Sequence, residues 1–174
     1  MSAANGQAAS PAGSDPDVAK KIAGLRSQVR ESFGKIVMTM MVLQRYRHQS
    51  LADLTSLVLE PLMQDRIVMA RSTAPDTPDP DTAGVAIWAS VSEEVDQKIR
   101  EQIKTGTWPV KLKAEDWTSG DIAWLFDVLA ADTRTTGAVI ANFQQVTEGR
   151  ELRIHPIIGR LVSPEMLEKM KKAS

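Results

Sequence analysis

Apolar residues recur at three- and four-residue steps over the first quarter of the chain, which is the period of an amphipathic α-helix. The run follows Ser14-Asp15-Pro16, where a capping side chain precedes a proline that suits a first helical turn. Its members are Val18, Ile22, Leu25, Val29, Phe33, Ile36 and Met40. The methionine-rich stretch VMTMMVL that ends this run is predicted to be core, because methionine fills irregular gaps. A second helix is expected over Leu51 to Gln64.

The remaining pattern alternates strands and helices. DRIVMARS and GVAIWASVS favour strands, and between them lies TAPDTPDPDT, whose prolines and aspartates indicate a solvated hairpin loop over 73–82. Further on, the pattern predicts a helix in EEVDQKIREQI, a strand over 122–130, a helix in DTRTTGAVIANFQQV, a strand in ELRIHPII and a helix in SPEMLEKMKKAS. This order predicts an α+β or α/β domain around an antiparallel or mixed sheet. Of the two we expect α+β, with a central mixed or antiparallel sheet flanked by helices.

The strand over 122–130 carries an aspartate among apolar residues. Strict alternation would place Leu125, Asp127 and Leu129 on one face of the sheet. The opposite face would then hold Trp124, Phe126 and Val128. Since an unpaired carboxylate in apolar surroundings costs several kcal/mol, Asp127 requires a partner or a chemical role.

Length and composition limit the class of protein. A chain of 174 residues suits one domain, so we expect a disordered tail over 1–16 and a single domain over 17–174. The absence of cysteine excludes disulfides and thiolate chemistry and fits a reducing compartment. The first residues do not resemble a signal peptide, and no later run approaches the length of a membrane span. We therefore expect a cytoplasmic protein without an integral membrane segment.

Charge is unevenly distributed along the chain. The net charge of −1 argues against binding to nucleic acid. Residues 17–47 carry seven basic side chains against two acids, whereas residues 53–97 carry nine acids against two arginines. An acidic partner could therefore be steered to the N-terminal part. There is no glycine-rich phosphate loop and no zinc-ligand spacing, so no metal and no permanently bound cofactor are expected.

Two histidines are the remaining candidates for proton chemistry. His155 precedes a proline at a predicted strand end, which favours a structural or surface role. His48 lies beside Arg45 and Arg47, whose positive charge favours a neutral imidazole that can act as a general base. A histidine in a polar connection is, however, often without a special role. A buried carboxylate such as Asp127 could orient this imidazole, although sequence does not show that the two meet.

The stretch AEDWTSGDIAWLFDVLA, preceded by GVAIWASVSEEVDQKI, resembles the RTX toxin-activating lysine acyltransferases, the haemolysin-activating family. The resemblance covers roughly residues 31–160 and places the family's catalytic aspartate on Asp127. The position of its catalytic histidine corresponds to His48, with Pro61 downstream. The family usually has a serine three residues before this histidine and an arginine directly after it, whereas this chain has Arg45 and Gln49.

The resemblance implies an N-acetyltransferase-like fold and transfer of a fatty acyl group from acyl carrier protein to internal lysines of an RTX protoxin. The phosphopantetheine thioester of the carrier would be the co-substrate. His48 would act as the base, oriented by Asp127, or would attack the thioester itself. Arg45 and Arg47 are candidates for docking the acidic carrier, and a homodimer is left open.

Two alternatives remain. The altered residues around His48 would also suit a non-catalytic chaperone or adaptor for an RTX protein. A small-molecule N-acyltransferase using coenzyme A is the other alternative, but the chain lacks the pyrophosphate-binding pattern that such enzymes usually place ahead of a helix.

Overall fold

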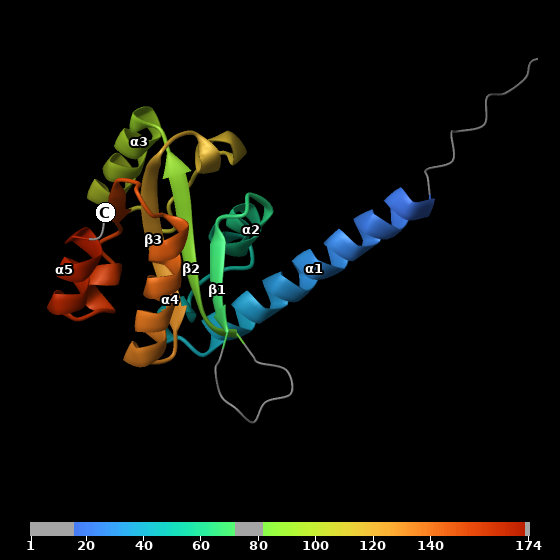
Figure 1. Cartoon of the computed structure of the whole chain (residues 1–174), viewed down its shortest axis with the longest axis horizontal. Helices are drawn as coiled ribbons and strands as arrows, with labels where there is room; N and C mark the ends of the chain where they lie inside the picture. Colours follow the sequence, from blue (N-terminus) through green and yellow to red (C-terminus); the bar gives the residue numbers. More distant parts are fainter. Residues whose placement is uncertain (1–15, 72–81, 173–174) are drawn as a thin grey trace, which may run out of the picture.

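Four strands form one mixed sheet in the order β1-β2-β3-β4 (Figure 1). The computed structural model describes residues 16–71 and 82–172. The strands are β1 Ile67–Arg71, β2 Thr82–Val91, β3 Ile122–Ala130 and β4 Leu152–Ile154. Strand β2 is antiparallel to both β1 and β3, and β4 is parallel to β3. The prediction of an α+β fold with a mixed sheet is therefore confirmed. The predicted loop over 73–82 and tail over 1–16 fall almost entirely outside the described residues.

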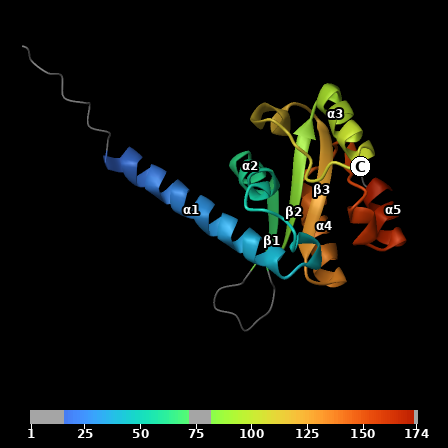
Figure 2. The same ribbon diagram turned by 180° about the vertical axis from the view of Figure 1, so that it is seen from behind.

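Helices lie on both faces of this sheet. The longer ones are α1 Pro16–Met41, α3 Glu93–Lys104, α4 Thr133–Val146 and α5 Pro164–Lys172. Helix α4 covers one face, where Val139, Ile140 and Phe143 pack against Trp88 and Leu125. Figure 2 shows the opposite face, where the end of α1 and the short α2 (Glu60–Met63) lie across the strands. Helix α3 covers the other half of that face through Val95 and Ile99.

The helix predicted over 51–64 is confirmed, with helical residues from 53 to 63, although its winding is not α-helical throughout. A turn comes first, in which the Asp53 carboxylate accepts bonds of 2.8 Å from the backbone N–H and the hydroxyl of Ser50. One π-helical turn, η2 (Thr55–Leu59), follows and continues into α2. Pro61 has no N–H with which to continue an α-helical ladder, which favours the wider turn before it.

Helix α1 packs against the sheet at its C-terminal end. Its first half extends away from the rest of the chain (Figure 1), whereas Ile36 and Met40 are buried against the sheet. The prediction that the methionine-rich stretch is core is wrong for Met38 and Met41, which are 69% and 76% exposed. Residues 36 and 40 share one face of the helix, and positions 38 and 41 point elsewhere.

Candidate active site

A β-bulge in β3 orients Asp127. Ile87 of β2 pairs with Asp127, and the next residue, Trp88, pairs with Leu125, so Phe126 is an extra residue in the ladder. The predicted strict alternation is therefore wrong beyond Leu125. Val128 packs together with Leu125 on the α4 face, instead of with Phe126 as predicted. The bulge turns Asp127 toward the face that α1 covers, which is how bulges near functional sites re-aim a side chain.

The buried acid has two side-chain partners from one short turn. Asp127 is 1% exposed. Nη2 of Arg45 donates to its Oδ1 over 3.1 Å, and the hydroxyl of Tyr46 donates to its Oδ2. The backbone N–H of Val128 also donates to Oδ1, over 2.7 Å. The partner that the sequence required for Asp127 is thus the pair Arg45 and Tyr46.

The turn after α1 brings these two residues to the sheet. Leu43 N–H bonds to the carbonyl of Met40, and Tyr46 N–H bonds to that of Leu43, which forms the 3₁₀ turn η1 (Gln44–Tyr46). Arg45 is further fixed by a 2.7 Å bond from Nη2 to the carbonyl of Val128. The side chain of Tyr46 is buried in the cluster around Ile36. Tight winding of one turn therefore presents two adjacent side chains to one carboxylate.

Burial raises the pKa of Asp127 to about 6, against the opposing effects of the Arg45 charge and the Val128 N–H. Removal from water disfavours the ionised form, and a nearby cation favours it. A carboxyl group with a pKa near neutrality can both accept and return a proton under physiological conditions. Asp127 is therefore suited to proton transfer.

The two residues that follow Tyr46 are in a different environment. Arg47 and His48 are both exposed. Within the described residues, no hydrogen bond or ion pair joins His48 to Asp127, so the structure does not form the predicted direct contact. Arg45, predicted as a docking residue, is instead paired with Asp127, with 23% of its side chain exposed. Arg47 alone of the two arginines is an exposed cation.

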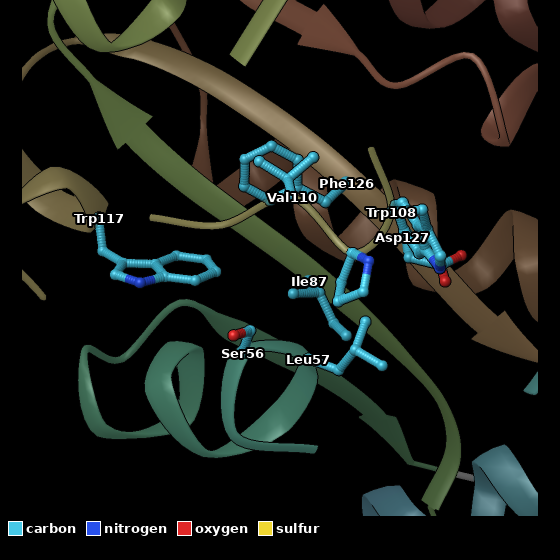
Figure 3. Close-up of a pocket in the computed structure, with 9 residues that line it drawn as sticks. Ser56, Leu57, Ile87, Trp108, Val110, Trp117, Phe126 and Asp127 are labelled. Atoms are coloured by element: carbon cyan, nitrogen blue, oxygen red, sulfur yellow. The ribbon is translucent and has the colours of Figure 1, made fainter. Parts of the chain in front are cut away.

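Each residue of the cluster lines a different hollow. Asp127 lines a narrow cavity of about 20 Å³, shown in Figure 3, together with Trp108, Phe126 and the more distant Trp117. Tyr46 lines an apolar groove of about 210 Å³ between the end of α1 and residues 49–54. The groove is formed by Val37, Met40, Met41, Tyr46, Gln49, Ser50, Leu51 and Leu54. Arg45 lines a polar recess of about 230 Å³ beside the start of α4.

His155 and the DWTSG stretch before β3 have structural roles. His155 is buried, its ring lies 4.9 Å from that of Trp108, and burial lowers its pKa. In the DWTSG stretch, the carboxylate of Asp116 accepts the N–H of Lys113, and the hydroxyl of Ser119 accepts that of Ser92. Gly120 lies so close to β2 that an added Cβ would be 2.6 Å from the carbonyl of Val91. These contacts attach the loop before β3 to the end of β2.

Sequence reasoning missed Tyr46. One signal could have found it: an arginine, Arg47, directly follows Tyr46, as it follows the histidine in the family pattern, whereas Gln49 follows His48. Because histidine is the most common general base, His48 was aligned with the family's histidine in preference to Tyr46.

Comparison with known proteins gives one result that bears on the whole domain. Residues 25–156, well over half of the chain, match the model of the RTX toxin acyltransferase family. No curated protein sequence matches the chain. Over the ranges 16–71 and 82–172 there is no cluster of three or more potential metal ligands, and no helix has the length and apolarity needed to cross a membrane.

Proposed function

Since the chain belongs to the RTX toxin acyltransferase family, we propose that it transfers a fatty acyl group from acyl carrier protein to lysine side chains of an RTX protoxin. The observation that carries this proposal is Asp127. A carboxyl group with a pKa of about 6 lies buried on a bulged strand, bonded to Tyr46 and Arg45 and next to an apolar groove. On this reading the sheet and its helices form an N-acetyltransferase-like domain.

The reaction must remove two protons from the lysine. Free lysine has a pKa of about 10.4, so the ammonium form dominates at neutral pH and is not nucleophilic. One proton leaves before attack, and a second leaves as the new C–N bond forms. We assign the first to His48, whose exposed imidazole can meet a substrate arriving from solvent. The second goes to the centre at Asp127.

The groove at Tyr46 suits the fatty acyl chain. Its lining is almost entirely apolar, with Met40 and Met41 on one side and Leu51 and Leu54 on the other. Methionine side chains adapt to flexible apolar ligands. Burial of each methylene contributes about 0.8 kcal/mol, so a long chain would be held more firmly than a short one. The thioester would then lie near the hydroxyl of Tyr46.

The acyl carrier protein would approach the exposed turn that carries Arg47. An acidic carrier is attracted by an exposed cation, which accelerates the encounter more than it strengthens the bound state. We assign the docking role to Arg47 in preference to Arg45, because the Arg45 guanidinium is bonded to Asp127 and to the carbonyl of Val128.

A non-catalytic adaptor for an RTX protein is the second candidate. This candidate is favoured because the side-chain partners of Asp127 are Arg45 and Tyr46. His48 therefore lacks the hydrogen bond to a carboxylate that would orient a histidine base. An adaptor would bind the toxin and leave its lysines unchanged.

Intact mass spectrometry of an RTX fragment co-expressed with this protein and acyl carrier protein tests the proposal. The expected result is a gain of one acyl chain per modified lysine, with tryptic mapping to lysine side chains. Binding of the fragment without any mass gain would favour the adaptor and refute the transferase.

A further inference from the structure

Among residues 16–71 and 82–172, Tyr46 is the one titratable side chain besides Arg45 that is hydrogen-bonded to the buried acid. Its hydroxyl donates to Oδ2 of Asp127, while Arg45 and the Val128 N–H occupy Oδ1. The two carboxylate oxygens therefore have separate tasks. Oδ1 is held by a permanent cation and by the backbone, neither of which gives up a proton near neutral pH. Oδ2 faces a phenol, which can accept one proton while it donates another.

Tyr46 also separates Asp127 from the groove. The tyrosine is 7% exposed and lines the apolar groove, whereas Asp127 is 1% exposed, lines the narrow cavity and is not among the lining residues of the groove. Lining residues of the groove other than Tyr46 carry no titratable group. A group bound in the groove would thus exchange protons with Asp127 through Tyr46.

We infer that Tyr46 is a proton relay between the substrate in the groove and the carboxylate of Asp127, in place of the direct contact expected between His48 and that acid. The inference deepens the proposed lysine acylation and rests on it. Tyr46 touches the reacting atoms in this scheme, and Asp127 acts through Tyr46.

The proton transfers balance over one turnover. The neutral lysine amine attacks the thioester carbonyl, and its nitrogen passes a proton to Oη of Tyr46 as the C–N bond forms. Tyr46 simultaneously passes its own proton to Oδ2 of Asp127. When the C–S bond breaks, the same path runs in reverse, and Asp127 returns a proton through Tyr46 to the leaving thiolate. The products are the amide and the carrier thiol, and the acid is ionised again.

The surrounding charges suit such a relay. Arg45 is the charged group that acts on Asp127, and the rest of the narrow cavity is lined by uncharged side chains. Asp132 of the α4 cap and Arg160 of η4 (Ile158–Arg160) lie farther out, around the polar recess beyond Arg45. The balance of burial against one guanidinium brings the pKa of Asp127 to about 6, close enough to neutrality for the carboxyl to take and release a proton.

Tyr46 is the only tyrosine in the chain, so its titration can be followed directly by the ultraviolet absorbance of phenolate. An adjacent carboxylate disfavours phenolate, so the pKa of Tyr46 should exceed the usual value of about 10 and fall toward it in Asp127→Asn. This readout does not depend on activity. Identical titration curves in the parent and Asp127→Asn would show that the two groups do not interact, and would overturn the relay.

The kinetic test uses Tyr46→Phe and Tyr46→His with myristoyl-loaded acyl carrier protein and an RTX fragment. Tyr46→Phe should lower kcat about 100-fold or more and abolish the fall in rate below about pH 6 that protonation of Asp127 causes in the parent. Tyr46→His should restore much of kcat, because imidazole can also accept and donate protons. Thr147→Val removes another buried hydroxyl, bonded to the carbonyl of Phe143, and should change neither quantity.

The outcomes separate the two claims. A parent protein that adds no acyl group to the fragment refutes the proposed function, and the relay falls with it, whatever the tyrosine titration shows. An active parent whose Tyr46→Phe variant keeps both kcat and the pH profile refutes the relay alone. A Tyr46→Phe variant that unfolds is replaced by Tyr46→His: a folded but inactive Tyr46→His variant would also count against proton transfer at this position.

Discussion

Two carboxylates lie buried on the same face of the sheet: Asp96 belongs to α3, and Asp127 belongs to β3 beside the turn after α1. Asp96 is 5% exposed, accepts the indole N–H of Trp124 over 2.7 Å and pairs with Arg100 over 2.8 Å. Asp127 is 1% exposed and is bonded to Arg45 and to the hydroxyl of Tyr46. Indole and guanidinium keep their protons, whereas phenol can exchange one. Burial with an arginine partner therefore does not by itself mark a functional acid; in the proposed relay, the exchangeable partner beside a groove distinguishes Asp127 from Asp96.

The largest expected effect separates these acids by rate. Asp127→Asn removes the proton acceptor and should lower acylation by about 100-fold to 10,000-fold, the range for general acid–base catalysis. Asp96→Asn should instead destabilise the fold by about 1–3 kcal/mol through its lost charged hydrogen bonds, with an unchanged rate per folded molecule. Product mass against time and urea unfolding of both variants measure the two quantities. Similar losses of rate in both would erase the distinction.

The second effect separates the acids by the pH dependence of stability. The folded protein holds the Asp127 proton up to about pH 6, whereas an unfolded chain releases it near pH 4. The raised pKa means that the free energy of unfolding falls as pH rises between these values, by up to on the order of 3 kcal/mol. Asp127→Asn should lack this fall, and Asp96→Asn should retain it. Urea unfolding across this pH range decides the matter, and a fall retained by Asp127→Asn would contradict the assignment.

A smaller effect is expected from His48→Ala. An exposed imidazole without a fixed partner is aligned only once substrate is present, so its removal should slow acylation by about tenfold, near or below the low end for general bases. The variant should have an unchanged thermal midpoint. If initial rates show a loss as large as that of Asp127→Asn, His48 is the principal base. The proton transfer assigned to Asp127 and Tyr46 would then be wrong.

The smallest effect concerns two exposed basic side chains, one near Asp127 and one on the same helix as Asp96. Arg47→Glu, beside the Asp127 centre, should raise KM for the acyl-loaded carrier by a few-fold, with the difference diminishing as salt screens the charges. Lys104→Glu, at the end of α3, makes the same change in charge on that helix and should leave KM unchanged. Initial rates against carrier concentration at two ionic strengths give the comparison. Equal KM values in both variants would exclude docking at Arg47.

Local patterns predicted much of this architecture. Helices α3 and α4 and strands β2 and β3 lie close to the bounds expected from sequence, because their periodicity and capping residues agree with their tertiary setting. Asp127 could be singled out because a charge in an apolar strand is costly wherever the strand lies. The outward direction of Met38 could also have been predicted, because a residue two positions from both Ile36 and Met40 lies on the opposite face of a helix.

The residues that surround Asp127 could not be predicted from local sequence patterns. Arg45 and Tyr46 lie more than 80 residues from Asp127 in sequence, and only folding brings them together. Their contact also depends on the bulge at Phe126, and no glycine or proline within β3 announces it. Counting alternate positions from Trp124 therefore gave a wrong face for Val128 and no indication of the neighbours of Asp127.

The extra residue at Phe126 divides β3 into two segments, and the alternation of side chains between the two faces of the sheet starts anew in the second segment. The upstream segment directs Trp124 toward α3, and the downstream segment directs Asp127 toward the turn after α1. Loss of one residue at the junction would leave the acid on its present face, whereas flattening the bulge without a deletion would turn it toward α4. Related chains that differ by one residue in this strand can therefore retain the same site, and a design that transplants the site must copy the junction as well as the side chains.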